Sequence, residues 1–375
     1  MAGIYIHIPF CQKRCSYCDF YSQTNLSLKK EYVSALCKEI KLRKNYLEQA
    51  TIFTLYFGGG TPSLLDKDDF CEIFACLNSH FDLSYLHEVT LEANPDDLNQ
   101  SFFDTLNQFP FNRLSIGIQS FDNGDLKLMN RRHSAEKAME AIYLAKENGF
   151  HNISIDLIYG LPNQTLEKWQ KNLEQALSLD IQHISAYHLT YEEGTILDSL
   201  LRQKKIQEVK EEDSLAMFEM LMALLTKSGF EHYEISNFAK KNFYSQHNSS
   251  YWSGEKYLGL GASAHSFDEK TRQWNISSIE KYNQAVSHSL PFYEMETLSE
   301  KEKYNEFIIT SLRTKKGIDL TLLEKKFGKE MLNYCIQNCQ THINNNRLCL
   351  KHNFVTLTQT GIFVSDKLIE DLICI

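Results

Sequence analysis

Three cysteines near the start of the chain, Cys11, Cys15 and Cys18, follow the spacing C-x-x-x-C-x-x-C. Thiolates are the usual ligands of iron–sulfur clusters, and a four-iron cluster held entirely by protein needs four of them. Three thiolates on one short loop can therefore hold three irons and leave the fourth open, as a catalytic zinc keeps one position open. A disulfide or a chance group of cysteines is the simpler alternative, and a reducing compartment disfavours it.

A structural zinc ion is a further alternative for this loop, but three ligands with no fourth nearby match zinc poorly. The spacing Cys335-x-x-x-Cys339-x-x-His342 also places three ligand types on one face of a predicted helix. Structural zinc sites more often take ligand pairs from separate elements, so we interpret these side chains as small buried residues. The other cysteines show no ligand spacing: Cys37, Cys71, Cys76, Cys349 and Cys374.

The composition is that of an ordinary globular protein, with 43% hydrophobic and 23% charged residues. A length of 375 residues suits two domains or one barrel with an appendage. The first predicted strand begins at Gly3 with no signal peptide before it, and no apolar run nears the ~20 residues of a membrane span. We therefore expect a cytoplasmic protein with reduced cysteines. The net charge of −9 argues against a nucleic-acid partner.

Strand-like and helix-like segments alternate in the first part of the chain, over residues 1–235. The predicted strands are 3–8, 51–57, 88–92, 113–118, 152–157 and 183–188. The predicted helices are 28–47, 68–78, 100–108, 135–148, 166–179 and 213–228. Strands separated by helices favour parallel βα units. The six units predict an α/β fold, an incomplete (β/α)6 barrel whose chemistry lies at the carboxyl ends of the strands.

The conspicuous motifs all follow predicted strands. The cysteine loop follows the first strand, Gly58-Gly-Gly-Thr-Pro62 follows the second, and Glu92 ends the third. Gln119 follows the fourth strand, and Asp156 lies near the end of the fifth. Because the carboxyl ends of parallel strands meet at one rim, we expect these residues to form a single active site.

The remainder of the chain differs from the barrel. Residues 231–290 look irregular, and we expect 236–295 to be a connecting segment. Helices are predicted at 299–312, 321–327 and 330–343, with a hairpin of 348–350 and 354–357 and a last helix after Gly361. Three helices and a hairpin predict a winged-helix-like α+β module over 296–375. Residues 291–375 carry 11 Lys and Arg against 11 Asp and Glu, so the module favours packing or protein contact over DNA.

Tyr5-Ile-His-Ile-Pro-Phe-Cys11, the three cysteines and Gly58–Pro62 together resemble the radical SAM family. More narrowly, nearly the whole chain resembles the branch related to oxygen-independent coproporphyrinogen III oxidase. The resemblance implies a 4Fe–4S cluster on Cys11, Cys15 and Cys18, with S-adenosylmethionine on the open iron and an electron donor for the cluster. It also implies that Gly59, Gly60 and Thr61 contact the amino-acid end of S-adenosylmethionine; a plain strand–helix turn is the alternative.

The polar positions of that family are matched here by Glu92, Gln119, Arg131 and Asp156. Glu92 offers a carboxylate to a cationic sulfonium, Asp156 suits a pair of ribose hydroxyls, and Arg131 suits a carboxylate. Each of them taken alone could equally cap a strand end. Tyr5 and Tyr17 flank the cysteine loop and are expected to cover the cofactor, with a place in the core as the alternative.

A second motif is His247-Asn-Ser-Ser-Tyr-Trp252. An imidazole can ligate haem iron, and aromatic rings can pack on a porphyrin, although the spacing alone suggests an ordinary loop histidine. H-N-x-x-Y-W resembles a mark of the haem-chaperone branch of the family, which implies that His247 ligates haem with Tyr251 and Trp252 beside it. His265 is a weaker second candidate, for which a structural role is favoured.

One departure from the oxidases separates the branches. The oxidases continue to C-x-x-x-C-x-x-C-x-C, whereas this chain reads Cys18-Asp19-Phe20, and it also lacks the longer segment that precedes their cysteine loop. Both features favour a haem chaperone, which binds haem and transfers it to an acceptor protein; a membrane-associated acceptor is left open. Coproporphyrinogen III dehydrogenase activity is the rival hypothesis, so whether the protein is an enzyme stays open as well.

Overall fold

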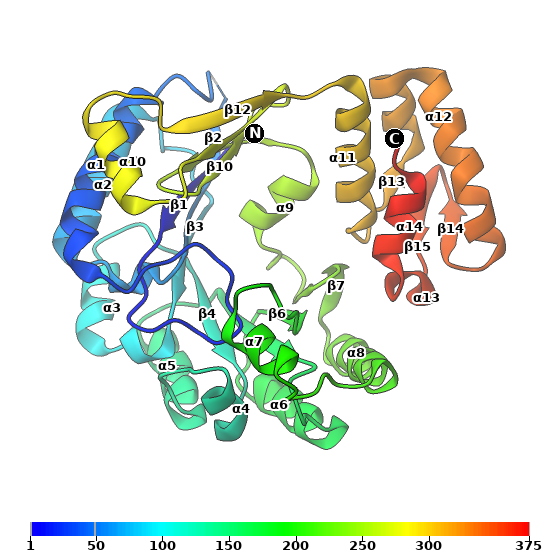
Figure 1. Ribbon diagram of the computed structural model, residues 1–375, viewed down its shortest axis with the longest axis horizontal. Coiled ribbons are helices and arrows are strands. Elements are labelled where there is room, and N and C mark those ends of the chain that lie inside the picture. The colour runs from blue at the N-terminus through cyan, green and yellow to red at the C-terminus, as the bar shows by residue number, and fades with distance from the viewer. Residues whose placement is uncertain (1, 49, 375) are drawn as a thin grey trace.

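The computed structural model describes residues 2–48 and 50–374, and its main feature is a twelve-stranded sheet (Figure 1). Six of these strands are parallel and neighbour one another in chain order. They are β1 Ala2–Ile8, β2 Ile52–Gly59, β3 Glu88–Ala93, β4 Arg113–Gln119, β5 Ile153–Tyr159 and β6 His183–His188. The predicted incomplete α/β barrel is confirmed.

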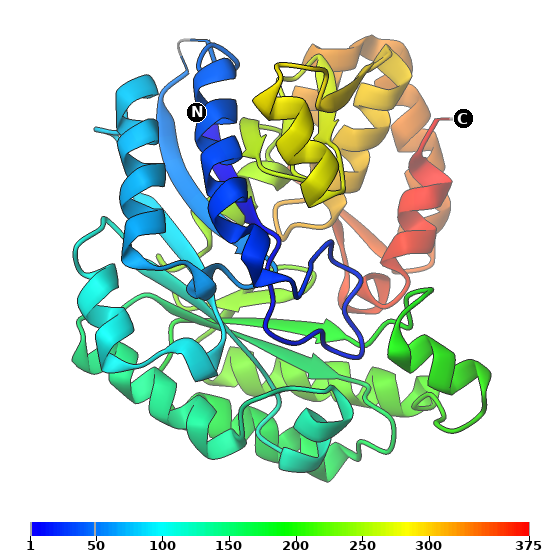
Figure 2. The same cartoon turned by 60° about the vertical axis from the view of Figure 1, so that its left-hand side comes forward.

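Helices cover the outer face of these strands (Figure 2). The helices that the sequence predicts here are α1 Lys29–Leu42, α2 Lys67–His80, α3 Gln100–Leu106, α5 Ala135–Glu147, α6 Leu166–Ser178 and α8 Glu211–Lys227. These helices bury one face of the strands, and Ile4, Ile6 and Ile8, which share one face of β1, are fully buried. Two short helices were not predicted, α4 Asn123–Leu128 and α7 Ile196–Arg202. The short 3₁₀ helices are η1 Leu26–Leu28, η2 Pro62–Leu64 and η3 Pro95–Asp97.

The expectation that residues 231–290 are irregular is wrong. This segment forms β7 Glu231–Glu234, β8 Asn237–Ala239, α9 Gln246–Trp252, β9 Lys256–Leu260, β10 His265–Phe267, β11 Thr271–Asn275 and α10 Ile279–Ser287. Strand β9 pairs in parallel with β1, and β12 Tyr293–Thr297 ends that side of the sheet. Strands of three to five residues are too short to show a clear alternation of apolar and polar residues, which is why the pattern missed them. The boundaries at 235 and 295 stay a prediction.

The carboxy-terminal module has a hydrophobic core of its own, around Tyr304, Ile308 and Leu323. Its elements are α11 Glu300–Leu312, β13 Ile318–Asp319, α12 Leu320–Asn344, β14 Leu348–Lys351, β15 Phe354–Leu357, α13 Gln359–Ile362 and α14 Ser365–Leu372. Gly328, with φ of 82°, breaks α12 into the two helices that the sequence predicts. The module lies beside the barrel, with α11 nearest to it (Figure 1). Within the described ranges, no helix is both long and apolar enough to cross a bilayer.

Candidate functional site

The cysteine loop runs from the carboxyl end of β1 to α1, across the open end of the barrel (Figure 2, dark blue). Cys11, Cys15 and Cys18 are free thiols and are all half-buried. Burial is the main cause that raises the pKa of Cys18 to about 11, and burial also raises the pKa of Cys11. Helix α4 helps to hold the loop in place, because the hydroxyl of Ser16 donates a hydrogen bond to the carbonyl of Leu128, the last residue of that helix, over 2.8 Å.

Two of the three sulfurs accept hydrogen bonds from residues on other elements. Thr61 Oγ1 lies 3.4 Å from Cys11 Sγ, and Arg131 Nη1 lies 3.3 Å from Cys15 Sγ. Arg131 Nη2 also donates to the carbonyl of Gly117 over 2.5 Å. The sequence singled out Arg131 for a ligand carboxylate, but it did not predict this contact with a thiol. Neutralising partners of this kind stabilise thiolates, so the surroundings fit a thiolate-held metal centre.

Two groups of side chains offer metal ligands in the sequence, the three loop thiols and the group of Cys335, Cys339 and His342. Among residues 2–48 and 50–374, no three His, Cys, Asp or Glu side chains converge as a single metal ion would require. A four-iron cluster places each thiolate on a different iron, so its ligands surround a volume and do not meet at one point. In the second candidate group, the sulfurs of Cys335 and Cys339 lie 4.0 Å apart, while His342 pairs with Asp371.

The glycine run brings the end of β2 against the cysteine loop. Gly59 has φ of 110°, and a Cβ on Gly60 would lie 2.7 Å from the carbonyl oxygen of Phe10. Only glycine fits both demands without strain. The amide of Gly59 donates to Glu92 over 3.1 Å, so the run connects two of the sequence motifs. Thr61, at the end of the run, donates a hydrogen bond to Cys11, so the run also contacts the cysteine loop. The structure therefore shows the predicted convergence of these motifs.

Two half-buried carboxyls, Glu92 and Asp156, lie close together at the carboxyl ends of β3 and β5. Burial raises the pKa of Glu92 to about 7, and the charge of Asp156 adds to this rise. The oxygens of Glu92 accept hydrogen bonds from the hydroxyl of Tyr56 at 2.8 Å and from Gly59. Burial also raises the pKa of Asp156 to about 6. The charge of the buried Arg113 opposes both rises, but the pKa of each carboxyl stays above its ordinary value, so both groups still suit a cationic ligand.

Gln119 occupies a strained position at the end of β4. Its φ is 72°, a left-handed value that costs a residue other than glycine on the order of 1–3 kcal/mol. A Cβ atom added to Gly117 would lie 3.0 Å from Nε2 of Gln119 and 3.5 Å from Nη2 of Arg131. Gln119 and Arg131 therefore converge over Gly117. No sequence pattern indicates this backbone conformation.

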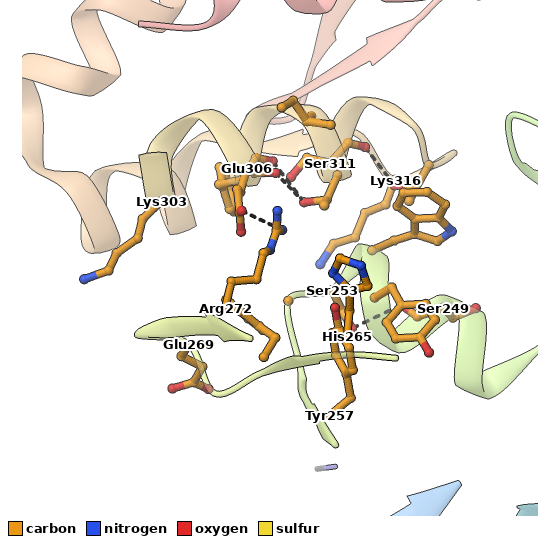
Figure 3. A pocket seen from close by; sticks show the side chains of 18 of the residues that line it. Ser249, Ser253, Tyr257, His265, Glu269, Arg272, Lys303, Glu306, Ser311 and Lys316 are labelled. Carbon is orange, nitrogen blue, oxygen red and sulfur yellow. Dashed lines mark hydrogen bonds and ion pairs between the residues drawn. The ribbon is translucent and has the colours of Figure 1, made fainter. Parts of the chain in front are cut away.

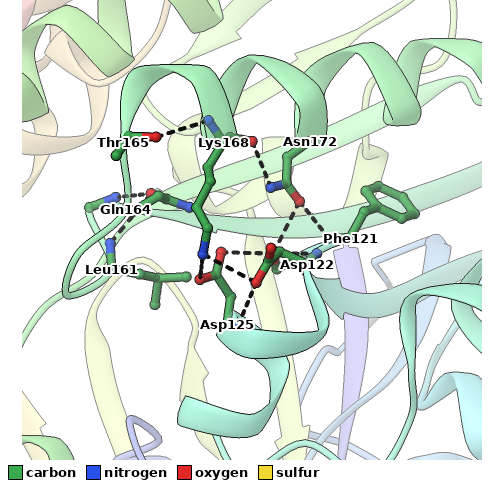
Figure 4. Close-up of polar contacts among 10 residues, drawn as sticks. Phe121, Asp122, Asp125, Leu161, Gln164, Thr165, Lys168 and Asn172 are labelled. Carbon is green, nitrogen blue, oxygen red and sulfur yellow. Dashed lines mark hydrogen bonds and ion pairs between the residues drawn. The ribbon is translucent and has the colours of Figure 1, made fainter.

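A partly buried polar network holds the turn after Gln119 (Figure 4). Asn172 Oδ1 accepts a hydrogen bond from the amide of Phe121 over 2.5 Å. Lys168 pairs with Asp122 at 3.3 Å and with Asp125 at 3.2 Å. Helix α6 thus fixes the β4–α4 turn from outside the barrel, which supports the strained backbone.

The two tyrosines predicted to cover the cofactor lie in different surroundings. Tyr17 packs with a small apolar cluster that includes Leu126 and Leu161, and it lies next to Cys15. Tyr5 donates to or accepts from His7 Nδ1 over 3.0 Å, and its ring stacks with that of Tyr56 at 6.0 Å. Tyr17 is therefore adjacent to the cysteine loop, and Tyr5 lies inside the barrel.

His247 lies deeper than the rim, at the level of Gly3 and Thr54 on β1 and β2. Its Nδ1 is 2.8 Å from Thr54 Oγ1, and its Nε2 is 2.7 Å from the hydroxyl of Tyr251. Burial, followed by the charge of Arg113, lowers the pKa of His247 to about 3. The imidazole is neutral and both of its nitrogens are engaged. Haem ligation by His247 stays a prediction, and it would require one of these hydrogen bonds to be exchanged for iron.

A large cavity of about 1420 Å³ separates the barrel from the carboxy-terminal module. Tyr251, Trp252 and residues of β9–β11 form the barrel wall, and α11 with the start of α12 forms the facing wall (Figure 3). Phe20 and Tyr21, which follow the last cysteine of the loop, also line the cavity. Its walls come from segments distant in the sequence, so the sequence did not predict it. Only the aromatic pair of the H-N-x-x-Y-W motif gave a signal.

Comparisons with known proteins agree with this architecture. The model of the radical SAM superfamily matches residues 5–176, and that of the HemN C-terminal domain matches residues 298–364. A protein named heme chaperone HemW from Lactococcus lactis is 32% identical, over 98% of this chain and 96% of its own length. Another of that name from Bacillus subtilis is 34% identical, over 88% of each chain.

A solved structure shares the whole fold. It is the coproporphyrinogen III oxidase HemN of Escherichia coli, described as a radical SAM enzyme, with a TM-score of 0.86 and 24% identity. The match covers 99% of this chain and 89% of that one. These matches agree with the cysteine loop, the glycine run and the barrel that brings them together. The chain belongs to the radical SAM superfamily, in the coproporphyrinogen III oxidase-like branch to which the relatives named HemW also belong.

Proposed function

We propose that this protein is a cytoplasmic haem chaperone, which binds haem and transfers it to an acceptor protein. The observation that carries the proposal is its similarity to proteins named heme chaperone HemW over 98% of the chain. The cavity beside Tyr251 and Trp252 supports it, because aromatic walls suit a flat macrocycle. The proposal includes an electron donor for the cluster; a nucleic acid has no part in it.

In this proposal, Cys11, Cys15 and Cys18 hold a 4Fe–4S cluster, and S-adenosylmethionine occupies the open iron. When bound, the cluster supplies one electron, which can break a carbon–sulfur bond of S-adenosylmethionine. The residues of the chain have simpler tasks. Thr61 and Arg131 stabilise two of the thiolates through the hydrogen bonds to their sulfurs.

The remaining rim residues bind and orient the S-adenosylmethionine. Gly59 and Gly60 let the backbone approach its amino-acid end, since neither has a side chain in the way. Glu92 loses its proton when a cation binds beside it, and Asp156 accepts hydrogen bonds from hydroxyls. Gln119 offers an amide from the opposite side of the rim. Tyr17 shields the loop from water.

Coproporphyrinogen III dehydrogenase activity is the alternative, favoured by the shared fold with HemN. Asp19 and Phe20 stand where the oxidase pattern continues to a fourth cysteine, and this departure argues against it. One anaerobic preparation tests both functions. We expect the reconstituted protein to bind haem in a one-to-one titration and to leave coproporphyrinogen unchanged when S-adenosylmethionine and a reductant are added. Decarboxylated porphyrinogen at catalytic turnover, or no haem binding, would overturn the proposed chaperone.

A further inference from the structure

The cavity between the barrel and the module contains one histidine that is free to bind a ligand. His265 lines the cavity from β10, and it is exposed. Across the described residues, neither of its ring nitrogens takes part in a hydrogen bond or an ion pair. The other histidine of the cavity wall, His7, has both nitrogens engaged, with Tyr5 at 3.0 Å and with the carbonyl of Tyr21 at 3.1 Å.

The walls around His265 are aromatic. On the barrel side, the rings of Tyr251 and Tyr257 are 4.6 Å apart, and those of Tyr257 and Phe267 are 6.2 Å apart. On the module side, Phe307 and Phe327 line the cavity with ring centroids 5.6 Å apart. The volume exceeds the ~300–1,000 Å³ of usual small-molecule sites, so a flat macrocycle has room between the two walls.

The module wall also carries cations that have no anionic partner. Of the lysines that line the cavity, Lys303 pairs with Glu300, and Lys315 pairs with Glu231. Lys316 and Lys326 form no ion pair within the part of the chain that the structure describes. Lysine ammonium groups are common partners of exposed carboxylates, and haem carries two carboxylates on one edge.

An ion pair joins the two walls of the cavity. Arg272 on β11 pairs with Glu306 on α11 at 2.5 Å and so joins the two walls, with His265 on the barrel side and Lys316 on the module side (Figure 3). His247 does not reach the cavity, but its hydrogen bond to Tyr251 fixes one of the rings that do. In this arrangement His247 is a positioning residue.

We propose that haem binds in this cavity, with an imidazole nitrogen of His265 as an axial ligand of the iron and with Lys316 and Lys326 at its propionates. The inference rests on the proposed chaperone function and gives it a site. It moves the iron ligand from the buried histidine of the H-N-x-x-Y-W motif to an exposed histidine 18 residues further along the chain. The aromatic pair of the motif then packs against the macrocycle.

The test is a titration of the full-length protein with haem and, in parallel, with metal-free protoporphyrin. The iron-free ring has the same shape and carboxylates but takes no axial ligand. For His265→Ala we expect haem affinity at least tenfold weaker, an altered haem spectrum and an unchanged affinity for the metal-free ring. His265→Met should restore haem binding with a changed spectrum, because Met can ligate haem iron. His288→Ala, an exposed histidine outside the cavity, is the matched control and should match the wild type.

Each other result is decisive as well. If the wild type binds no haem, the chaperone function fails and this inference fails with it. If the wild type binds haem and His265→Ala leaves both affinity and spectrum unchanged, only this inference is overturned. Equal weakening of both ligands by His265→Ala would assign His265 to shape and reject it as the ligand. Loss of the histidine-ligated spectrum in His247→Ala, with His265→Ala unaffected, would return the ligand to His247.

The propionate contacts have a separate readout. Changing both Lys316 and Lys326 to Ala should weaken binding of the metal-free ring about tenfold and have little effect on its dimethyl ester, which lacks the charges. Lys227→Ala is the control, because Lys227 is the exposed last residue of α8 and does not line the cavity. An equal effect on the free acid and the ester would contradict the assignment of the lysines.

Discussion

The guanidinium of Arg131 donates a hydrogen bond to the sulfur of Cys15 over 3.3 Å while it is anchored on the carbonyl of Gly117. A fixed cation beside one thiolate stabilises negative charge at the site. A reduced cluster carries one more negative charge than an oxidised one, so this contact favours reduction.

Arg131→Met should therefore lower the reduction potential of the reconstituted cluster. We expect a shift on the order of tens of mV, where about 59 mV corresponds to a factor of ten for one electron. Titration of the paramagnetic reduced state measures it. Arg132→Met is the matched control, because Arg132 also contacts the cysteine loop, at Gln12, and pairs with Asp97 at 2.8 Å, but among the described residues it donates no hydrogen bond to a sulfur. Equal potentials in the Arg131 variant and the wild type would contradict the role given to Arg131.

The three loop cysteines should be separable from the other thiols by their effect on the iron content. Changing any one of Cys11, Cys15 or Cys18 to Ala should abolish a stable cluster after reconstitution, because too few thiolates remain. Cys71→Ala removes an exposed thiol far from the rim and should keep the full cluster. Iron and sulfide analysis decides the matter. A variant of the loop with undiminished iron would remove that cysteine from the ligand set.

Binding of S-adenosylmethionine should strengthen as the pH rises from 6 to 8. Burial raises the pKa of Glu92 to about 7, so below that pH its carboxyl is protonated in the free protein. A cationic ligand binds the ionised form, so its affinity falls by up to about tenfold for each unit below the pKa. Equilibrium dialysis under anaerobic conditions measures this slope. Glu92→Gln should bind weakly and with a flatter profile; an unchanged slope in that variant would exclude Glu92 as the source.

Gly59→Ala should destabilise the protein more than Gly149→Ala. Both glycines have positive φ, 110° and 90°, so both substitutions strain the backbone. A Cβ on Gly59 would lie 2.6 Å from the ring of His7, whereas one on Gly149 would meet no atom within 4 Å. We expect an additional cost of about 1–3 kcal/mol at Gly59 from overpacking. Urea unfolding of both variants gives the difference, and equal losses would show that the ring of His7 moves aside freely.

The repeating units of the barrel were predictable from the sequence because each strand places apolar residues on a buried face, as Ile4, Ile6 and Ile8 do on β1. The convergence of the motifs followed from the same fact, since parallel strands end at one rim. Two hydrogen bonds agree with this expectation. Thr61 donates one to Cys11, and the amide of Gly59 donates the other to Glu92.

The rest depends on contacts between segments distant in the sequence. Strand β9 joins the barrel beside β1, yet it has only five residues and no distinctive pattern. The left-handed backbone of Gln119 leaves no trace in residue type. The spacing alone suggests an ordinary loop histidine at His247, whereas the residue lies buried on α9 with Thr54 and Tyr251 at its two nitrogens, which the sequence does not show. The cavity beside His265 exists only because the module packs against the barrel.

Mössbauer spectroscopy of the anaerobically reconstituted protein, with and without S-adenosylmethionine, tests most directly whether Cys11, Cys15 and Cys18 hold a cluster with one open iron. The account predicts a 4Fe–4S cluster in which one iron of the four changes its spectrum when S-adenosylmethionine is added. A cluster whose irons all stay unchanged, or a protein that assembles no cluster, would contradict it.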